Sequence, residues 1–158
     1  NLFTAIIASS VINIFKDTIE EVIFLAVLMP IIASMGGVAA TQTLTITVRG
    51  LALGQIMSSN YFYLLSREIT VGLVNGFFWA LVLGFISYFW FNEITIALII
   101  LLSMVINLFM AVISGMGIPL MLKFFKLDPA IAGSVIVTTI TDVVGFLSFL
   151  GLATVFYS

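Results

Sequence analysis

Long apolar runs, separated by short polar segments, occupy most of this chain. A helix needs roughly 20 apolar residues to cross a hydrocarbon layer about 30 Å thick. The sequence predicts five transmembrane helices, at about residues 1–15, 22–48, 69–91, 94–122 and 129–157. Open sheet edges are not tolerated in lipid, and the short alternating segments of a porin-like barrel are missing from the sequence. We therefore expect an all-α membrane protein with a single transmembrane domain.

Composition supports this fold class and excludes several functions. Of the 158 residues, 63% are hydrophobic and 8% are charged, whereas a soluble domain carries about 25% charged residues. The chain has no cysteine and no histidine, which excludes disulfides, the usual zinc sites and histidine-based catalysis. A net charge of −2 does not provide the positive charge that binding to nucleic acid requires. No constellation of nucleophile, base and metal is present, so we do not expect an enzyme.

The charged segments predict the orientation of the chain in the membrane. The segment from Arg49 to Arg67 and the segment KFFKLD (123–128) hold four of the five basic residues, whereas KDTIEE (16–21) is acidic overall. Basic residues favour the cytoplasmic side, so we expect a cytoplasmic N-terminus and an external C-terminus. The first run is short and lacks an initiating methionine, which indicates the trimmed end of a longer chain rather than a signal peptide.

Asp142 lies inside an otherwise apolar or hydroxyl-bearing run, TTITDVVGFL (138–147). A charge at the bilayer centre costs about 2.5–3.5 kcal/mol on insertion scales, and all five basic residues lie near span ends. Counting back by fours gives Thr138, Ser134 and then Ala130 beside Pro129, which places these residues on one helical stripe. Three interpretations stay open: a protonated structural acid, a proton carrier, or an acid that faces a cation.

The second span is unusually rich in residues that interrupt regular helix hydrogen bonding and in polar residues that could border a water-filled path. It contains Pro30 and a Gly36–Gly37 pair, which predict close helix contact or backbone exposed to a cavity. Polar residues follow towards the cytoplasm: Thr41, Gln42, Thr43, Thr45 and Thr47. Thr41, Thr45 and Arg49 share one face, and this face predicts the border of a water-filled path. A single threonine can instead bond back to its own helix and do nothing further.

Two other spans carry small or polar residues at intervals of four, and in the fourth span these are Ser103, Asn107, Ala111 and Gly115. Gly72, Gly76, Ala80 and Gly84 form such a stripe in the third span, and its simplest interpretation is close helix packing. Pro119 lies near the end of the fourth span, where we expect the helix to bend or fray.

The residues near Asp142 offer only oxygen ligands, which suit Mg²⁺, Ca²⁺, Mn²⁺ or alkali ions. One carboxylate is a poor match for a divalent ion, but membrane channels are commonly symmetric oligomers. A two-fold axis beside the fifth span would bring two Asp142 side chains together, and a divalent cation would relieve their repulsion. Mg²⁺ sheds water reluctantly and usually contacts one or two carboxylates through a partly retained water shell. This reasoning favours a divalent cation without choosing among them.

Two segments resemble the transmembrane domain of the MgtE family of magnesium channels and transporters: LAVLMPIIASMGGVAATQTLTITVRGLALGQI (25–56) and LDPAIAGSVIVTTITDVVGFLSF (127–149). SREITVGLVNG (66–76) and GMGIPLMLKF (115–124) extend the resemblance over essentially the whole chain. It implies a homodimer with five helices per subunit, in which the second and fifth helices line a central pore. It also implies that Asp142 binds hydrated Mg²⁺ and that cytoplasmic regulatory domains precede the first span, so this chain is expected to be the pore domain alone.

These expectations define the predicted site and function. The predicted metal-binding residues are Asp142, Thr138 and Ser134, and the predicted pore-lining residues are Pro30, Gly36, Gly37, Thr41, Gln42, Thr45, Pro129 and Ala130. We expect a channel that moves a hydrated divalent cation, Mg²⁺ above Mn²⁺ or Ca²⁺, across a bacterial plasma membrane. The alternative is a secondary transporter of a divalent cation coupled to protons or Na⁺, as intramembrane acids often serve. Pro30 and Pro129 open similar segments, PIIAS and PAIAG, which is a weak indication of the repeats found in transporters.

One departure from the family pattern bears on selectivity. The family usually has Asn after the paired glycines and another glycine two positions later, where this sequence has Val38 and Ala40. Loss of an amide beside the pore puts the details of ion preference and of any gating contact at this level in doubt.

Overall fold

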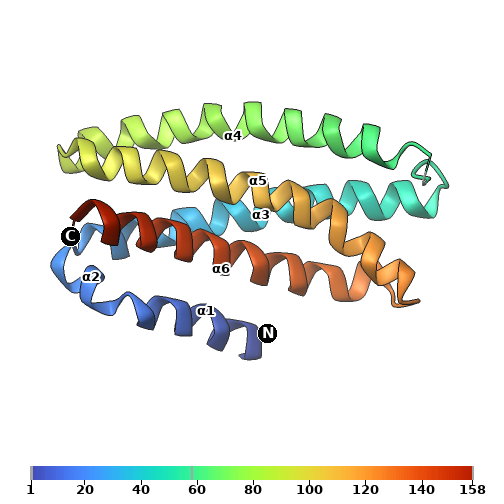
Figure 1. The fold of residues 1–158 in the computed structure, drawn as a ribbon, viewed down its shortest axis with the longest axis horizontal. Coiled ribbons are helices and arrows are strands. Elements are labelled where there is room, and N and C mark those ends of the chain that lie inside the picture. The colour runs from blue at the N-terminus through green and yellow to red at the C-terminus, as the bar shows by residue number, and fades with distance from the viewer. Residues whose placement is uncertain (1, 58, 158) are drawn as a thin grey trace.

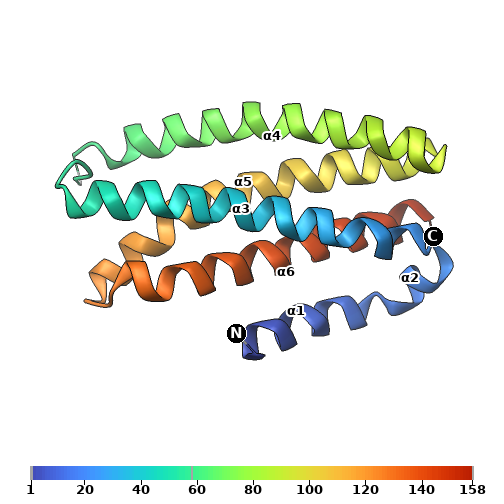
Figure 2. The same cartoon turned by 180° about the vertical axis from the view of Figure 1, so that it is seen from behind.

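The computed structural model describes residues 2–57 and 59–157, with the side chain of Ile131 left out of the description. Within these residues the chain is helical nearly throughout (Figure 1). The elements in chain order are α1 (Leu2–Ile14), α2 (Lys16–Glu21), α3 (Phe24–Ala52), α4 (Tyr61–Phe91), α5 (Ile94–Phe124) and α6 (Pro129–Tyr157). The long helices run antiparallel to their chain neighbours, as Figure 2 shows from behind. The predicted all-α class is confirmed.

Four helices of the described residues are long and apolar enough to cross a membrane: α3, α4, α5 and α6. The first predicted span corresponds to α1, which has 13 residues, followed by the short polar helix α2. At about 1.5 Å rise per residue, α1 is about 20 Å long and does not match the thickness of the hydrocarbon layer.

The helices extend beyond the predicted ends of the spans on the side that carries the basic residues. Helix α4 begins at Tyr61 rather than near residue 69, and α3 continues to Ala52, so Arg49 and Arg67 lie within helices instead of in a loop. Hydropathy reports where a segment can contact lipid, whereas the backbone hydrogen bonds of a helix continue into the interfacial region. The connection therefore shortens to residues 53–60, where Gly54 takes a positive φ of 71°.

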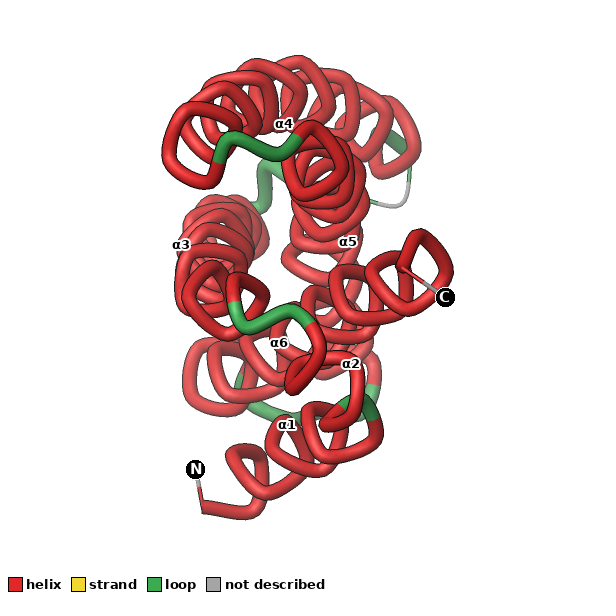
Figure 3. The backbone as a smooth tube through the Cα atoms, turned by 90° about the vertical axis from the view of Figure 1, so that its left-hand side faces the viewer, coloured by secondary structure: helices red, strands yellow, loops and turns green. Residues whose placement is uncertain are grey.

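Helix α5 is the centre of the bundle. It packs against α3, α4 and α6, while α3 also packs on α6 and α1 packs on α6. Figure 3 views this arrangement along the bundle, with α4 at one edge and α1 at the other. Pro119 does not end α5, which continues to Phe124 and brings its last turns beside the start of α6 (Figure 1). The helix therefore does not fray at Pro119, which is buried in the bundle, and the predicted bend stays a prediction.

The core follows from the apolar faces that α5 presents to its neighbours. The largest fully buried side chains of the core come from α3, α5 and α6 and include Leu25, Leu28, Ile32, Ile96, Ile99, Ile100, Met104, Phe149 and Leu150. Polar contacts close one end of the bundle: the Tyr157 hydroxyl donates to Glu93 Oε1 at 2.7 Å. The Thr18 and Thr154 hydroxyls share a hydrogen bond of 2.8 Å, which joins α2 to α6. The C-terminal end of α6 is thus held at the turn between α4 and α5.

Candidate functional site

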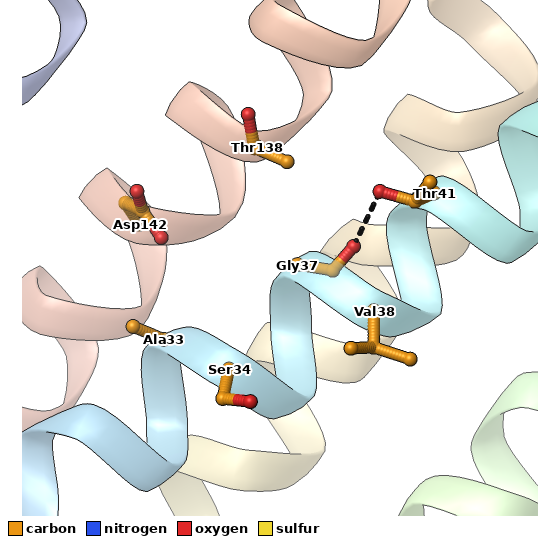
Figure 4. Close-up of a pocket in the computed structure, with 7 residues that line it drawn as sticks. All are labelled: Ala33, Ser34, Gly37, Val38, Thr41, Thr138 and Asp142. Atoms are coloured by element: carbon orange, nitrogen blue, oxygen red, sulfur yellow. Dashed lines mark hydrogen bonds between the residues drawn. The ribbon is translucent and has the colours of Figure 1, made fainter. Parts of the chain in front are cut away.

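A groove of about 550 Å³ lies between α3 and α6, open on one side. Figure 4 shows that Thr138 and Asp142 come from α6 and that the remaining lining residues come from α3. The lining residues are Ala33, Ser34, Gly37, Val38, Thr41, Thr138 and Asp142. Small side chains allow the two helices to form this groove: a Cβ at Gly37 would lie 3.9 Å from the Thr138 methyl group, and one at Gly133 would lie 2.9 Å from Leu44.

Asp142 lies close to the middle of the membrane-spanning helix α6. It follows Pro129 by 13 residues and precedes Tyr157 by 15, which places it about 20 Å of helix rise from either end. Its carboxylate makes no hydrogen bond or ion pair with any of the residues described. The described residues also hold no group of three or more acidic or histidine side chains that would form a closed metal cage. The groove therefore presents one unpartnered carboxylate at mid-depth.

The groove threonines Thr41 and Thr138 bond to their own helices, and so does Thr45, which does not line the groove. Thr41 donates to the Gly37 carbonyl at 2.8 Å (Figure 4), Thr45 donates to the Thr41 carbonyl, and Thr138 donates to the Ser134 carbonyl, also at 2.8 Å. The interpretation that a threonine of this helix bonds back to its own backbone is therefore confirmed for Thr41 and Thr45. Each hydroxyl oxygen retains lone pairs after donating its proton. Thr41 and Thr138 thus offer acceptors to the groove, which suit the protons of water molecules bound to a cation.

The structure brings some of the predicted site residues of α3 and α6 together and separates the others. Of the predicted site residues, Asp142, Thr138, Gly37 and Thr41 line one groove. Gly36 is buried and faces α5, while Gln42 lines a different groove. The other predicted residues are absent from the lining set: Ser134, Thr45, Pro30, Pro129 and Ala130.

Sequence reasoning did not single out Ser34 and Ala33 as lining residues. Ser34 precedes Thr41 by seven residues, two helical turns, and lies on the same face of α3. Extending the stripe of Thr41 and Thr45 back through Val38 would have reached it. The apolar Val38 interrupts the polar pattern, and this interruption hid the stripe.

The two departures from the family pattern have different surroundings. Val38 lines the groove and is 54% exposed. Ala40 is fully buried against α5. The two helices approach so closely here that a Cβ added at Gly115 of α5 would lie 2.9 Å from the Ala40 carbonyl oxygen. Of the two, Val38 alters the surface that an ion in this groove would meet.

Asn107 of α5 supports the groove from behind. Its side chain is fully buried, and Nδ2 donates to the Ile32 carbonyl of α3 at 3.1 Å. The same carboxamide fills the space beside Gly36 and beside Gly145 of α6, where a Cβ would lie 2.8 Å from Nδ2. Its Oδ1 is buried with no hydrogen-bond partner among the described residues. One side chain thus sets the spacing of three helices next to Asp142.

Comparison with known proteins identifies the family. A family model described as MgtE, divalent cation transporter, matches residues 29–152, which covers most of the chain. The chain belongs to the MgtE family. The sequence is 30% identical over 155 residues to the magnesium transporter MgtE of Bacillus subtilis, covering 98% of this chain and 34% of that protein.

Two further MgtE relatives give the same alignment length. The magnesium transporters MgtE of Enterococcus faecalis and Thermus thermophilus are each 28% identical, over 98% and 96% of this chain. This chain spans about one third of the length of the relatives it matches, 34% in each case. The matched family residues contain both halves of the groove, from Ala33 to Asp142.

Proposed function

We propose that this chain forms the conducting part of a divalent-cation channel that carries Mg²⁺ across the membrane. The observation that carries the proposal is the unpartnered Asp142 carboxylate, which lies midway along a membrane-spanning helix in a groove lined by oxygen acceptors. Membership of the MgtE family and the similarity to proteins named magnesium transporters support Mg²⁺ as the transported ion.

The transported ion passes the groove with part of its water shell. A carboxylate attracts the cation, and the Thr41 and Thr138 oxygens accept hydrogen bonds from its bound water. A groove of about 550 Å³ has room for such a shell. Retained water avoids the cost of stripping Mg²⁺, which dehydrates reluctantly.

The proposal includes a second copy of the chain. The groove is open on one side and holds a single carboxylate, which neutralises only one of the two charges of Mg²⁺. Two copies related by a two-fold axis beside α3 and α6 place a second Asp142 opposite the first, and the doubly charged ion then relieves the repulsion between the two carboxylates. Helices α3 and α6 line the central path in this arrangement.

The basic residues support an orientation with the 53–60 and 125–128 connections in the cytoplasm. Lys123 and Lys126 lie at the second of these ends, and Arg49 lies in the last turns of α3 before the first. The end of α6 that bonds to Glu93 then faces outside. A cytoplasmic regulatory region, contributed by the longer protein, would contact the basic side.

Transport by purified protein in liposomes tests the proposal. Vesicles loaded with a Mg²⁺ indicator report uptake by the parent protein, by Asp142→Asn and by Asp142→Ala. Both substitutions are expected to abolish or strongly reduce uptake, because each removes the charge that attracts the ion. Glu20→Gln is the matched control, since Glu20 is exposed on α2 and remote from the groove. Uptake by both Asp142 variants at the rate of the parent would show that the acid is structural.

The same vesicles separate a channel from a coupled transporter. Mg²⁺ uptake driven by a K⁺-valinomycin potential, without a proton or Na⁺ gradient, is expected for a channel. If Mg²⁺ uptake needs an opposing proton or Na⁺ gradient, the protein is a coupled transporter and the channel mechanism is wrong. Competition by Mn²⁺ and Ca²⁺ in this assay measures the ion preference of a groove that contains Val38.

A further inference from the structure

A second polar groove lies on the opposite face of α3 from Asp142. Its volume is about 180 Å³, and α3, α4 and α5 all contribute to it. Successive residues of a helix are about 100° apart, so Thr41 of the first groove and Thr43 of the second are directed about 200° from each other around α3. The lining residues are Ala39, Gln42, Thr43, Ile46, Glu68, Val71, Gly72, Asn75, Gly76, Leu108 and Val112.

Close helix packing creates this groove. A Cβ at Gly72 of α4 would overlap Val112 of α5, and one at Gly76 would lie 3.1 Å from Leu108 Cβ. On the other side, a Cβ at Gly115 of α5 would lie 2.7 Å from Thr43 Cβ. Helices α3 and α4 therefore each lie tightly on α5, and they make few contacts with each other. The space between them is floored by Leu108 and Val112, and polar side chains stand along its walls.

Thr43 is the exception among the threonines of α3. Thr41, Thr45 and Thr47 each donate to the carbonyl four residues earlier, whereas the Thr43 hydroxyl makes no hydrogen bond within the described chain. Thr43 is 8% exposed and lines the second groove. The Thr43 side chain is more than nine-tenths buried, but its hydroxyl oxygen is not among the fully buried polar atoms without a partner and is accessible from the groove. This hydroxyl is therefore available to a ligand or an ordered water molecule in the groove.

Three more polar side chains of the same groove lack partners. Glu68, Gln42 and Asn75 make no side-chain hydrogen bond or ion pair with any described residue. The lining set contains no lysine or arginine. Asn75 follows Tyr61 by 14 residues and precedes Phe91 by 16, so it lies at the middle of α4. Asn75 and Gln42 are exposed and Glu68 is half-buried, so an ion can reach all three from the open side of the groove.

We propose that Glu68, Gln42, Asn75 and Thr43 form a second cation site, which binds a singly charged alkali ion such as Na⁺. The donors are one carboxylate, two carboxamide oxygens and one hydroxyl, all of which are hard oxygen ligands. One carboxylate balances one positive charge, whereas a divalent ion here would leave an uncompensated charge beside Leu108 and Val112. This site is separate from the proposed conduction groove, because α3 stands between the two.

Thermal unfolding of the purified full-length protein in detergent tests this site. The melting temperature is compared in NaCl and in N-methyl-D-glucamine chloride at equal ionic strength, with EDTA present to remove divalent ions. Binding to the folded state is expected to raise the Tm in Na⁺ by about 2 °C or more. Glu68→Gln, which keeps the shape of the side chain, is expected to abolish the rise, and Thr43→Val to reduce it. Asp142→Asn and Glu20→Gln are expected to keep it.

Direct binding of ²²Na⁺ to the same preparations gives a second readout. The parent protein and Asp142→Asn are expected to bind the label, and Glu68→Gln to lose it. Should Glu68→Gln fail to yield folded protein, Thr43→Val and Gln42→Leu take its place in both measurements. Absence of a Na⁺-specific rise in the parent, or a rise and labelling that persist in Glu68→Gln, would overturn the assignment. So would an equal rise with Mg²⁺, measured without EDTA in the Asp142→Asn protein and abolished by adding Glu68→Gln, because it would assign a divalent ion to this groove.

Discussion

Asn107 Nδ2 donates to the carbonyl oxygen of Ile32 at 3.1 Å and so joins α5 to α3 directly behind the groove that contains Asp142. The two residues are 75 positions apart in the chain. The first prediction is that Asn107→Ala destabilises the bundle, because it removes this bond and leaves a cavity between Gly36 and Gly145. The expected cost is about 1–3 kcal/mol, measured as a lower Tm in detergent. Asn13→Ala, an exposed change on α1, is the control. An unchanged Tm for Asn107→Ala would show that this contact does not support the fold.

The second prediction concerns the glycine that receives the Asn107 side chain. A Cβ at Gly36 would overlap Asn107 Nδ2, so Gly36→Ala forces the carboxamide to move and is expected to cost about 1–3 kcal/mol. Gly117→Ala is the matched control, because nothing lies within 4 Å of a Cβ there and the helix gains about 0.5–1 kcal/mol. The double variant with Asn107→Ala is expected to lose less than the sum of its parts. Additive losses would mean that Gly36 and Asn107 do not compete for the same space.

A third prediction addresses the apolar position in the proposed conduction groove. Val38→Asn adds a carboxamide to the groove lining and is expected to raise the apparent affinity for Mg²⁺ by about 2- to 10-fold, the worth of one hydrogen bond. The measurement is the Mg²⁺ concentration at half-maximal uptake in liposomes. Ala40→Gly, two residues further along α3, is buried away from the groove and should leave this concentration unchanged. Equal affinity in Val38→Asn and parent would place the ion out of reach of this position.

The contact between Tyr157 and Glu93 gives a fourth prediction. Tyr157→Phe removes a hydroxyl that donates to Glu93 Oε1 at 2.7 Å and is expected to cost about 1.5–3 kcal/mol, because the acceptor carries a charge. Hydrogen exchange should rise in the last turns of α6 more than elsewhere, since this bond holds them to the turn between α4 and α5. Tyr63→Phe, at a position 70% exposed, should change neither the Tm nor the exchange. Uniformly faster exchange would argue against a local role for the bond.

Hydropathy was sufficient to predict the class of fold and the approximate position of the four long helices. Hydropathy predicted the ends of the helices poorly. Arg67 and Glu68 led to a predicted start of the third span near residue 69, although α4 begins at Tyr61. Charged residues mark the limit of the lipid-contacting segment, but they do not interrupt the hydrogen bonds of a helix.

The candidate site was predictable where helical periodicity is regular. Thr138 and Asp142 are four residues apart, and both line the groove. Gln42 follows Thr41 directly, and a turn of about 100° was enough to place it in the other groove. Contacts between distant segments, such as Asn107 with Ile32, leave no periodic trace in one sequence. Such contacts require the packed structure.

The bonding of the groove threonines to their own helices has a further consequence for which solutes are admitted. Thr41 and Thr138 have already directed their protons to backbone carbonyls, which leaves the Ser34 hydroxyl as the side-chain donor of the lining set. Chloride or phosphate entering here would meet a carboxylate and almost nothing able to donate to it. In the proposed channel, the groove would therefore exclude anions by its chemistry, without the need for a narrow opening.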